Sequence, residues 1–177
     1  MAFNWIGSFQ NESNQYSSEH PIDEVWSRIG RFGTTSFLNT FRPDKQDIPW
    51  DEYLKYAQVR IRQSIEFRIA AQSATLLTSP LPLYYSFLNL TRAFLALGPE
   101  LMPRSMHGLK FIKADNLLDS KAQLSKGTFT DYLDALSVEW QEGHEITLGD
   151  ALGHIVELAH DYRSFSSNQS YVQSVAV

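Results

Sequence analysis

The amino-acid sequence predicts an all-α protein, an up-and-down helical bundle of four to five helices with short N-terminal helices and an extended C-terminal tail. Two stretches, residues 50–77 and 80–97, carry this prediction because their apolar residues recur at helical spacing over several turns. Residues 148–163 repeat the pattern after a threonine suited to capping. We expect a single helical domain over residues 1–177, the N-terminal part of a longer protein if the natural chain continues beyond its present end.

The elements before the first long helix are short. Residues 8–23 are polar and should form a surface loop. A helix is expected over residues 23–32, where apolar residues have helical spacing and two glycines weaken the end. Residues 34–41 are expected to be helical, and residues 42–48 are a charged connector.

The helix over residues 50–77 begins after Pro49, with two acidic residues in its first turn near the positive end of the helix dipole. Arg68 and Gln72 lie within its apolar stripe. Either Arg68 faces the neighbouring helix across an anion or a carboxylate, or its stem extends to solvent at the edge of the bundle.

The helix over residues 80–97 is expected to be the most buried element, because it is apolar on almost every side. Ser79 should cap its start and Gly98 should end it. We expect the following side chains to be shielded from solvent: Phe87, Leu88 and Leu95.

One narrow side of this central helix is polar. At about 100° per residue, Tyr85, Asn89 and Arg92 fall on that side. A buried guanidinium is costly unless partners satisfy it, so we expect at least two hydrogen bonds to a largely buried Arg92. The partner is a carboxylate such as Glu66 or Glu52, a set of backbone carbonyls, or an anionic ligand.

The C-terminal half is divided into shorter elements. Residues 98–128 are rich in loops, with a short helix expected over 106–112, and a helix capped by Thr128 or Thr130 should span 130–138.

Thr147 and Asp150 form a variant of the capping box at the start of the helix over residues 148–163. The final residues alternate like the beginning of a strand, which favours either a disordered tail or a natural protein that continues beyond Val177.

Positive charge and hydrogen-bond donors gather in and just after the central helix. The set is Tyr85, Asn89, Arg92, Arg104, His107, Lys110 and Lys113. Such groups can hold a phosphate, and a histidine can move a proton during phosphodiester cleavage. The catalytic candidates are therefore His107, Arg92 and Arg104, and the anion- or ligand-binding candidates are Tyr85, Asn89, Arg92 and Lys110. In the alternative interpretation, Arg92 pairs with a core carboxylate and His107 caps a helix.

Several other kinds of chemistry are excluded. The chain has no cysteine, and it has no zinc-protease motif, Walker loop, dinucleotide glycine motif or nucleophile elbow. A possible ligand set on the last helix points away from its apolar face, so we expect no metal and no cofactor; its members are His154, Glu157, His160 and Asp161.

Charge and hydropathy restrict the location and the partners. A net charge of −5 argues against a broad nucleic-acid-binding face. The N-terminus lacks the pattern of a signal peptide, and the apolar stretch over residues 80–97 is short and interrupted for a membrane span. We expect a cytoplasmic protein that does not enter the membrane.

Short motifs along most of the chain resemble YaaC-like proteins, a bacterial family whose members are usually longer than this chain. The motifs are Asn4-Trp5-Ile6-Gly7-Ser8-Phe9, Tyr84-Tyr85-Ser86-Phe87, Arg92-Ala93-Phe94-Leu95, His107-Gly108-Leu109, Gly127-Thr128-Phe129 and Ile146-Thr147-Leu148. The central motifs are also similar to the HEPN superfamily, which implies a bundle of four or five helices used in toxin–antitoxin, antiviral and RNA-processing systems.

Catalytic HEPN members are metal-independent ribonucleases with an R-x4-6-H motif, from which this sequence departs. Only two residues separate Arg104 from His107, and Arg92 lies far upstream. The resemblance therefore implies a non-catalytic HEPN-like module that binds a partner protein, an adjoining domain or a second copy of itself in prokaryotic defence or stress response. The alternative is a metal-independent endoribonuclease acting on RNA, with His107 as the acid–base and an arginine at the phosphorane.

Overall fold

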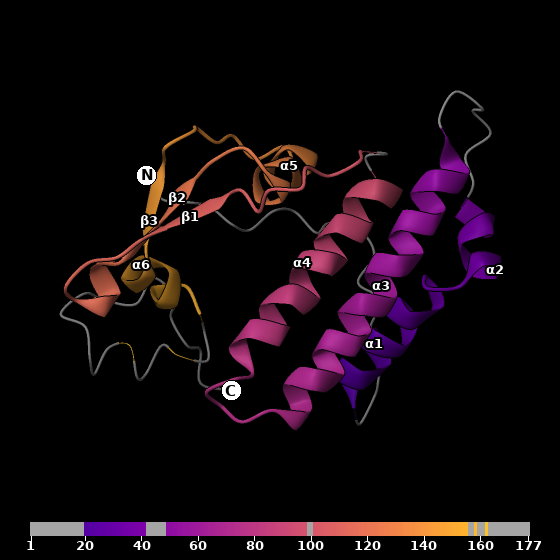
Figure 1. Ribbon diagram of the computed structural model, residues 1–177, viewed down its shortest axis with the longest axis horizontal. Helices are drawn as coiled ribbons and strands as arrows, with labels where there is room; N and C mark the ends of the chain where they lie inside the picture. The colour runs from indigo at the N-terminus through magenta and orange to yellow at the C-terminus, as the bar shows by residue number, and fades with distance from the viewer. Residues whose placement is uncertain (1–19, 42–48, 99–100, 156–157, 159–161, 163–177) are drawn as a thin grey trace, which may run out of the picture.

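The computed structural model describes residues 20–41, 49–98, 101–155, 158 and 162. Its helices are α1 (Pro21–Arg31), α2 (Thr35–Leu38), α3 (Trp50–Ser73), α4 (Pro80–Leu97), α5 (Thr128–Ala135) and α6 (Leu148–Gly153), with the 3-10 turns η1 (Asn39–Phe41) and η2 (Leu117–Asp119). Its strands are β1 (Leu109–Ile112), β2 (Lys121–Leu124) and β3 (Glu145–Thr147). A helical part formed by α1 to α4 lies beside a part formed by the sheet, α5 and α6 (Figure 1).

The centre of the helical part is the pair α3 and α4, which lie side by side (Figure 1). Small residues bring the two helices together at Ser64 and Ser86, both fully buried. The Ser86 hydroxyl donates to the Ser64 carbonyl at 2.8 Å, and the two hydroxyl oxygens are 3.2 Å apart. Two buried clusters line this pair: Ala57, Ile61, Ala93 and Ala96, and then Leu38, Trp50 and Leu54.

Helices α3 and α4 agree closely with the predictions, with two corrections. Helix α3 ends at Ser73 rather than at residue 77, because the carbonyl of Thr75 accepts from the amides of Thr78 and Ser79 in a local turn. Helix α4 spans the predicted residues, and the Gly98 amide closes its end on the Phe94 carbonyl at 2.8 Å. The Ser79 hydroxyl makes no capping bond, so that part of the prediction is wrong. Elsewhere, α1 begins at Pro21 rather than at residue 23, and α5 spans Thr128–Ala135 with Gly127 at its N-cap, rather than residues 130–138 after a threonine cap.

The expectation that Phe87 is shielded from solvent is also wrong. Leu95 is fully buried and Leu88 is half-buried, but Phe87 is 59% exposed. The reason is that α3 covers one side of α4, whereas the part with the sheet contacts α4 through α5. The opposite side of α4 carries a row of exposed apolar side chains, here called the α4 outer face: Leu83, Tyr84, Phe87 and Phe94.

The three-stranded antiparallel sheet has the order β1-β2-β3 and corrects the all-α prediction: the protein is mostly helical with a small sheet. Strand β1 replaces the short helix expected over residues 106–112. Gly108, with a φ of 88°, turns the chain into β1, and the alternation of Leu109 to Ile112 suits a strand paired with β2.

The register gives the sheet one apolar and one polar face. Residues paired across strands share a face, so the apolar face holds Leu109, Phe111, Ala122, Leu124 and Ile146. The opposite face carries the ion pair between Lys121 and Glu145, whose nitrogen and oxygen are 2.7 Å apart. In that pair, the hydrogen bond with the partner raises the pKa of Lys121 and lowers the pKa of Glu145.

The predicted cap of the last helix is confirmed, since the Thr147 hydroxyl accepts from the Asp150 amide at 2.9 Å. However, α6 ends at Gly153 and is much shorter than predicted. The expectations for residues 8–19, for the connector over 42–48, for most of residues 156–163 and for the C-terminal tail lie outside the described residues. Among the described helices, none is long and apolar enough to cross a membrane.

Candidate functional site

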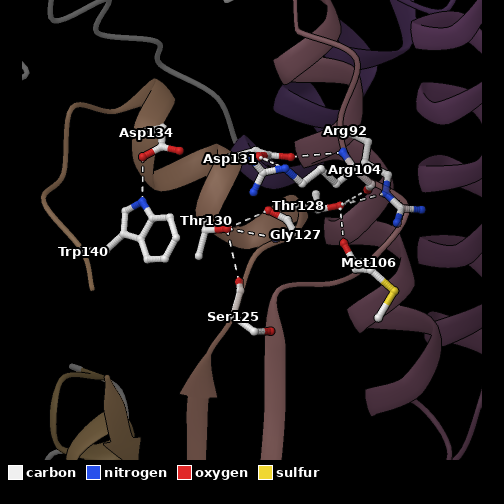
Figure 2. Close-up of polar contacts among 10 residues, drawn as sticks. All are labelled: Arg92, Arg104, Met106, Ser125, Gly127, Thr128, Thr130, Asp131, Asp134 and Trp140. Atoms are coloured by element: carbon white, nitrogen blue, oxygen red, sulfur yellow. Dashed lines mark hydrogen bonds and ion pairs between the residues drawn. The ribbon is translucent and has the colours of Figure 1, made fainter. Parts of the chain in front are cut away.

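Thr128, a residue that is 1% exposed, connects three segments through its hydroxyl (Figure 2). The segments are the loop over residues 101–108, the start of α5, and α4. This hydroxyl donates toward the carbonyls of Arg104 and Met106, at 3.0 and 3.1 Å. Its oxygen accepts from Nε of Arg92 at 3.2 Å. We call the set formed by Thr128, this loop and Arg92 the junction.

Arg92 makes the two hydrogen bonds that the sequence predicts. The second runs from Nη2 to the carbonyl of Ser105 at 2.8 Å. Within the described residues, its partners are thus a hydroxyl and a carbonyl, whereas the carboxylates considered earlier, Glu52 and Glu66, are exposed on α3. Arg92 is half-buried rather than largely buried.

Arg104 also makes contacts at the junction. Its Nε lies 3.4 Å from Oδ1 of Asp131, and its backbone amide donates to Oδ2 at 3.1 Å. Asp131 is 2% exposed, so its carboxylate is a buried charge whose two oxygens are satisfied by one residue of the loop. The Arg104 side chain itself remains 49% exposed.

Two glycines allow the loop and α5 to approach closely. A Cβ on Gly127 would lie 2.4 Å from the amide nitrogen of Gly108 and 2.7 Å from the carbonyl oxygen of Met106. Two backbone hydrogen bonds stabilise this contact. The amide of Phe129 donates to the carbonyl of His107, and the amide of Ser125 donates to the carbonyl of Gly108, both at 2.9 Å. Position 127 therefore has no room for a side chain.

His107 lies at the edge of the junction, against the tyrosines of α4. Its Nδ1 is 2.7 Å from the hydroxyl of Tyr84, and its ring stands edge-on to Tyr85, which stacks on Phe67 of α3. Burial raises the pKa of Tyr84, as does Tyr85, whereas the positive charge of Arg92 lowers it. His107 thus contacts Tyr84, whose pKa also responds to the charge of Arg92.

The other two binding candidates lie apart from this cluster. The Asn89 side chain is buried and accepts from Nη1 of Arg60 at 3.2 Å while donating to the Tyr85 carbonyl at 2.8 Å, so it ties α3 to α4. Lys110 is exposed on the polar face of the sheet, opposite Gln123.

The comparison with known families bears on this arrangement. The profile of the YaaC-like protein family matches residues 37–176. The chain belongs to the YaaC-like family. No curated protein and no solved structure matches it.

In this YaaC-like protein, three of the short motifs that carried the resemblance meet at the junction. The Arg92, His107 and Gly127 motifs lie on three different elements, and the hydrogen bonds of the junction connect them. Sequence reasoning overlooked Tyr84, Thr128 and Asp131 as site residues. For Tyr84 and Thr128 a signal was present, because both belong to motifs that resemble the family.

The remaining described candidates of the YaaC-like chain make contacts within the fold. Arg68 pairs with Asp23 of α1 at 2.8 Å and lies over the ring of Trp26, so it does not face Arg92. The His154 ring bonds the Asp150 carbonyl at 2.7 Å, and its three suspected companions lie outside the described residues. In the part of the chain that the structure describes, no group of three or more potential ligands is placed to hold a metal.

Proposed function

We propose that this YaaC-like protein is a cytoplasmic, non-catalytic HEPN-like helical module that binds a partner protein or an adjoining domain in a prokaryotic defence or stress-response system. The observation that carries the proposal is the α4 outer face. Its four side chains are between 40% and 59% exposed, and they follow one side of a helix that is otherwise packed on α3. Exposed apolar side chains grouped on one side of a helix favour an interaction site.

The cations of the candidate site support a non-catalytic role. Arg92 is held by the Thr128 hydroxyl and the Ser105 carbonyl, and Arg104 neutralises a buried carboxylate. Guanidinium groups that hold the fold together in this way are less available to stabilise a developing phosphorane than groups that project freely into a groove. The defence or stress-response setting is supported by the family resemblance.

Site-specific photo-crosslinking tests the proposal. A photoreactive phenylalanine analogue placed at position 87 should give a defined adduct in cells, identified by mass spectrometry as a partner protein, another part of the same natural chain, or a second copy. Val59, which is 52% exposed on α3, provides a matched control position that should give none.

A second variant makes the test quantitative. The partner identified by crosslinking should no longer co-purify with the Phe87→Glu variant. The melting temperature should stay unchanged, because substitution of an exposed side chain alters stability by only about 0.5 kcal/mol. Equal labelling at positions 59 and 87, with a monomeric protein in solution, would contradict the proposal.

The second candidate function is a metal-independent ribonuclease, favoured by the contact between His107 and Tyr84, whose pKa the charge of Arg92 lowers. In this hypothesis His107 is the acid–base and Arg92 stabilises the phosphorane. The test is cleavage of RNA in the presence of a chelator. His107→Asn, which keeps a nitrogen toward Tyr84, should lose cleavage, whereas Lys110→Ala on the sheet should retain it. RNA left intact by the parent protein excludes this candidate.

A further inference from the structure

A cavity of about 340 Å³ lies in the helical part of the protein, with a wall built from α1, α2, α3 and α4. Its described lining residues carry no charged side chain. Ile61 and Ala93 are each 1% exposed, whereas Phe94 is 43% exposed, so the cavity extends from the interior to the surface. Phe94 also belongs to the α4 outer face, and the cavity therefore opens beside that face.

An apolar cavity that reaches the surface favours an apolar occupant, because apolar side chains are less stable in water than in contact with one another. The charged connector over residues 42–48, which follows η1 and precedes α3, is a poor occupant. Four of its seven residues are charged, and burying an unpaired charge is costly. The occupant is therefore expected from a segment without charge.

The segment over residues 3–9 has the composition that this cavity requires. None of its residues is charged, and four are large and apolar: Phe3, Trp5, Ile6 and Phe9. Aromatic side chains bury about 150–250 Å² each and contribute strongly to packing. Within the sequence, this apolar segment directly precedes the polar stretch that leads into α1.

The length of the chain allows the segment to reach the cavity. The first helix begins at Pro21, and its lining residue Ile29 lies eight residues further along, about 12 Å at the rise of an α-helix. Residues 10–19 form a polar connector of ten residues, which spans up to about 33 Å when extended. This reach is sufficient for the segment to fold back along α1.

We propose that the segment over residues 3–9 of this same chain docks in the cavity between α1, α2, α3 and α4, with Trp5 and Ile6 as its main apolar contacts. The proposal does not depend on the function proposed above. The bound segment does lie beside the α4 outer face, because Phe94 is common to that face and to the cavity.

The absence of cysteine from the chain provides a direct test, because an introduced pair forms a single defined disulfide. Full-length protein with Ser8→Cys and Leu90→Cys, the latter at a half-buried lining position, should form an intramolecular disulfide under mild oxidation. The reaction should be about tenfold faster than with Ser8→Cys and Ile146→Cys, where the second position is 40% exposed in the sheet. Mass spectrometry and non-reducing electrophoresis give the yields.

Three outcomes would overturn the proposal: equal rates for the two pairs, a faster reaction at position 146, or a disulfide between two copies. Circular dichroism confirms folding before oxidation. Leu97→Cys, at another half-buried lining position, replaces Leu90→Cys if that variant fails to fold.

Substitutions within the segment separate docking from simple tethering. Trp5→Gln with Ile6→Gln, added to the pair at positions 8 and 90, should lower the disulfide rate to that of the control pair. The same two substitutions in the cysteine-free protein should increase the fluorescence of anilinonaphthalene sulfonate, which binds exposed apolar surface. Tyr16→Gln in the polar connector is the matched control and should change neither measurement. A disulfide rate that ignores Trp5→Gln and Ile6→Gln would mean that the connector alone brings the segment near, and the proposal would fail.

Discussion

Thr128 shows how much of this protein depends on one hydroxyl. It receives the guanidinium of Arg92 and faces two loop carbonyls, so three segments share a single buried oxygen. A carboxylate, a set of carbonyls or an anionic ligand was expected to satisfy Arg92, and a hydroxyl and one carbonyl are sufficient because the guanidinium is only half-buried. Neutral acceptors of this kind hold a cation in place without adding a second buried charge.

Gly127→Ala should destabilise the protein by about 2 kcal/mol, because the added Cβ would clash with the backbone of Gly108 and Met106. Urea denaturation measures the loss. Gly30→Ala is the matched control, since its Cβ meets only Ile65 at 3.8 Å and alanine is favoured over glycine inside a helix. That variant should gain about 0.5 kcal/mol; equal effects at the two positions would contradict the close contact.

Arg92→Met should raise the pKa of Tyr84 further, because the guanidinium is the charge that lowers it against the effects of burial and Tyr85. Tyrosinate absorbance across an alkaline titration, taken as the difference from Tyr84→Phe, gives the pKa. The raised pKa favours the neutral phenol in the fold, so its stabilising effect is present below pH 10.0 and is lost as the pH rises through the folded value. A Tyr84 titration identical in both proteins would separate Arg92 from this site.

At the scale of elements, α3 and α4 are held together by small residues at regular intervals. Ala57, Ser64 and Ala71 are buried at seven-residue spacing on α3, opposite Ser86 and Ala93 on α4. Small side chains allow two helices to approach closely and to bond across the interface, as Ser64 and Ser86 do. The pair is therefore a close-packed hairpin rather than two helices separated by large side chains.

Ser64→Leu should cost about 3 kcal/mol, because the larger side chain forces the helices apart and breaks the bond to Ser86. Ala70→Leu introduces the same side chain at an exposed position of α3 and should change stability by less than about 0.5 kcal/mol. Thermal unfolding followed by circular dichroism compares the two. A small loss at position 64 would show that the helices can separate without cost.

The sequence predicts the long helices well because their periodicity and end signals are local. Pro80 and Gly98 mark the two ends of α4, and Thr147 marks the start of α6. The strands were missed because they contain three or four residues each, too few to show a clear period. The exposure of Phe87 was missed because an all-round apolar helix has the same pattern whether this fold or another molecule covers it.

The candidate site was predicted in part for the same reason. Arg92 and His107 were identified from charge and helical position; His107 contacts Tyr84, and the charge of Arg92 lowers the pKa of the same tyrosine. Thr128 and Asp131 act through contacts between segments far apart in the chain, which spacing within one helix cannot reveal. Asn89 and Lys110 have side chains suited to an anion site. However, Asn89 bonds to Arg60 of α3, and Lys110 lies on strand β1.

At the scale of the whole molecule, the junction joins the helical part to the part with the sheet. Thr128→Val keeps the shape but removes the shared oxygen, so it should cost about 1–3 kcal/mol. Hydrogen exchange should become faster in β1 and β2 while the amides around Ile61 in α3 stay protected. Thr78→Val, at an exposed turn, is the control and should leave both unchanged. Uniform acceleration throughout the protein would mean that the two parts open together.

The contact between Gly108 and Gly127 also sets an order of events in time. It can exist only after α4, the loop and the start of α5 have all reached their places, whereas α3 and α4 are joined by a short turn and can pair early. An interaction formed after the transition state affects mainly the rate of unfolding. Gly127→Ala should therefore speed unfolding in stopped-flow experiments and leave refolding nearly unchanged, while Ser64→Leu should slow refolding.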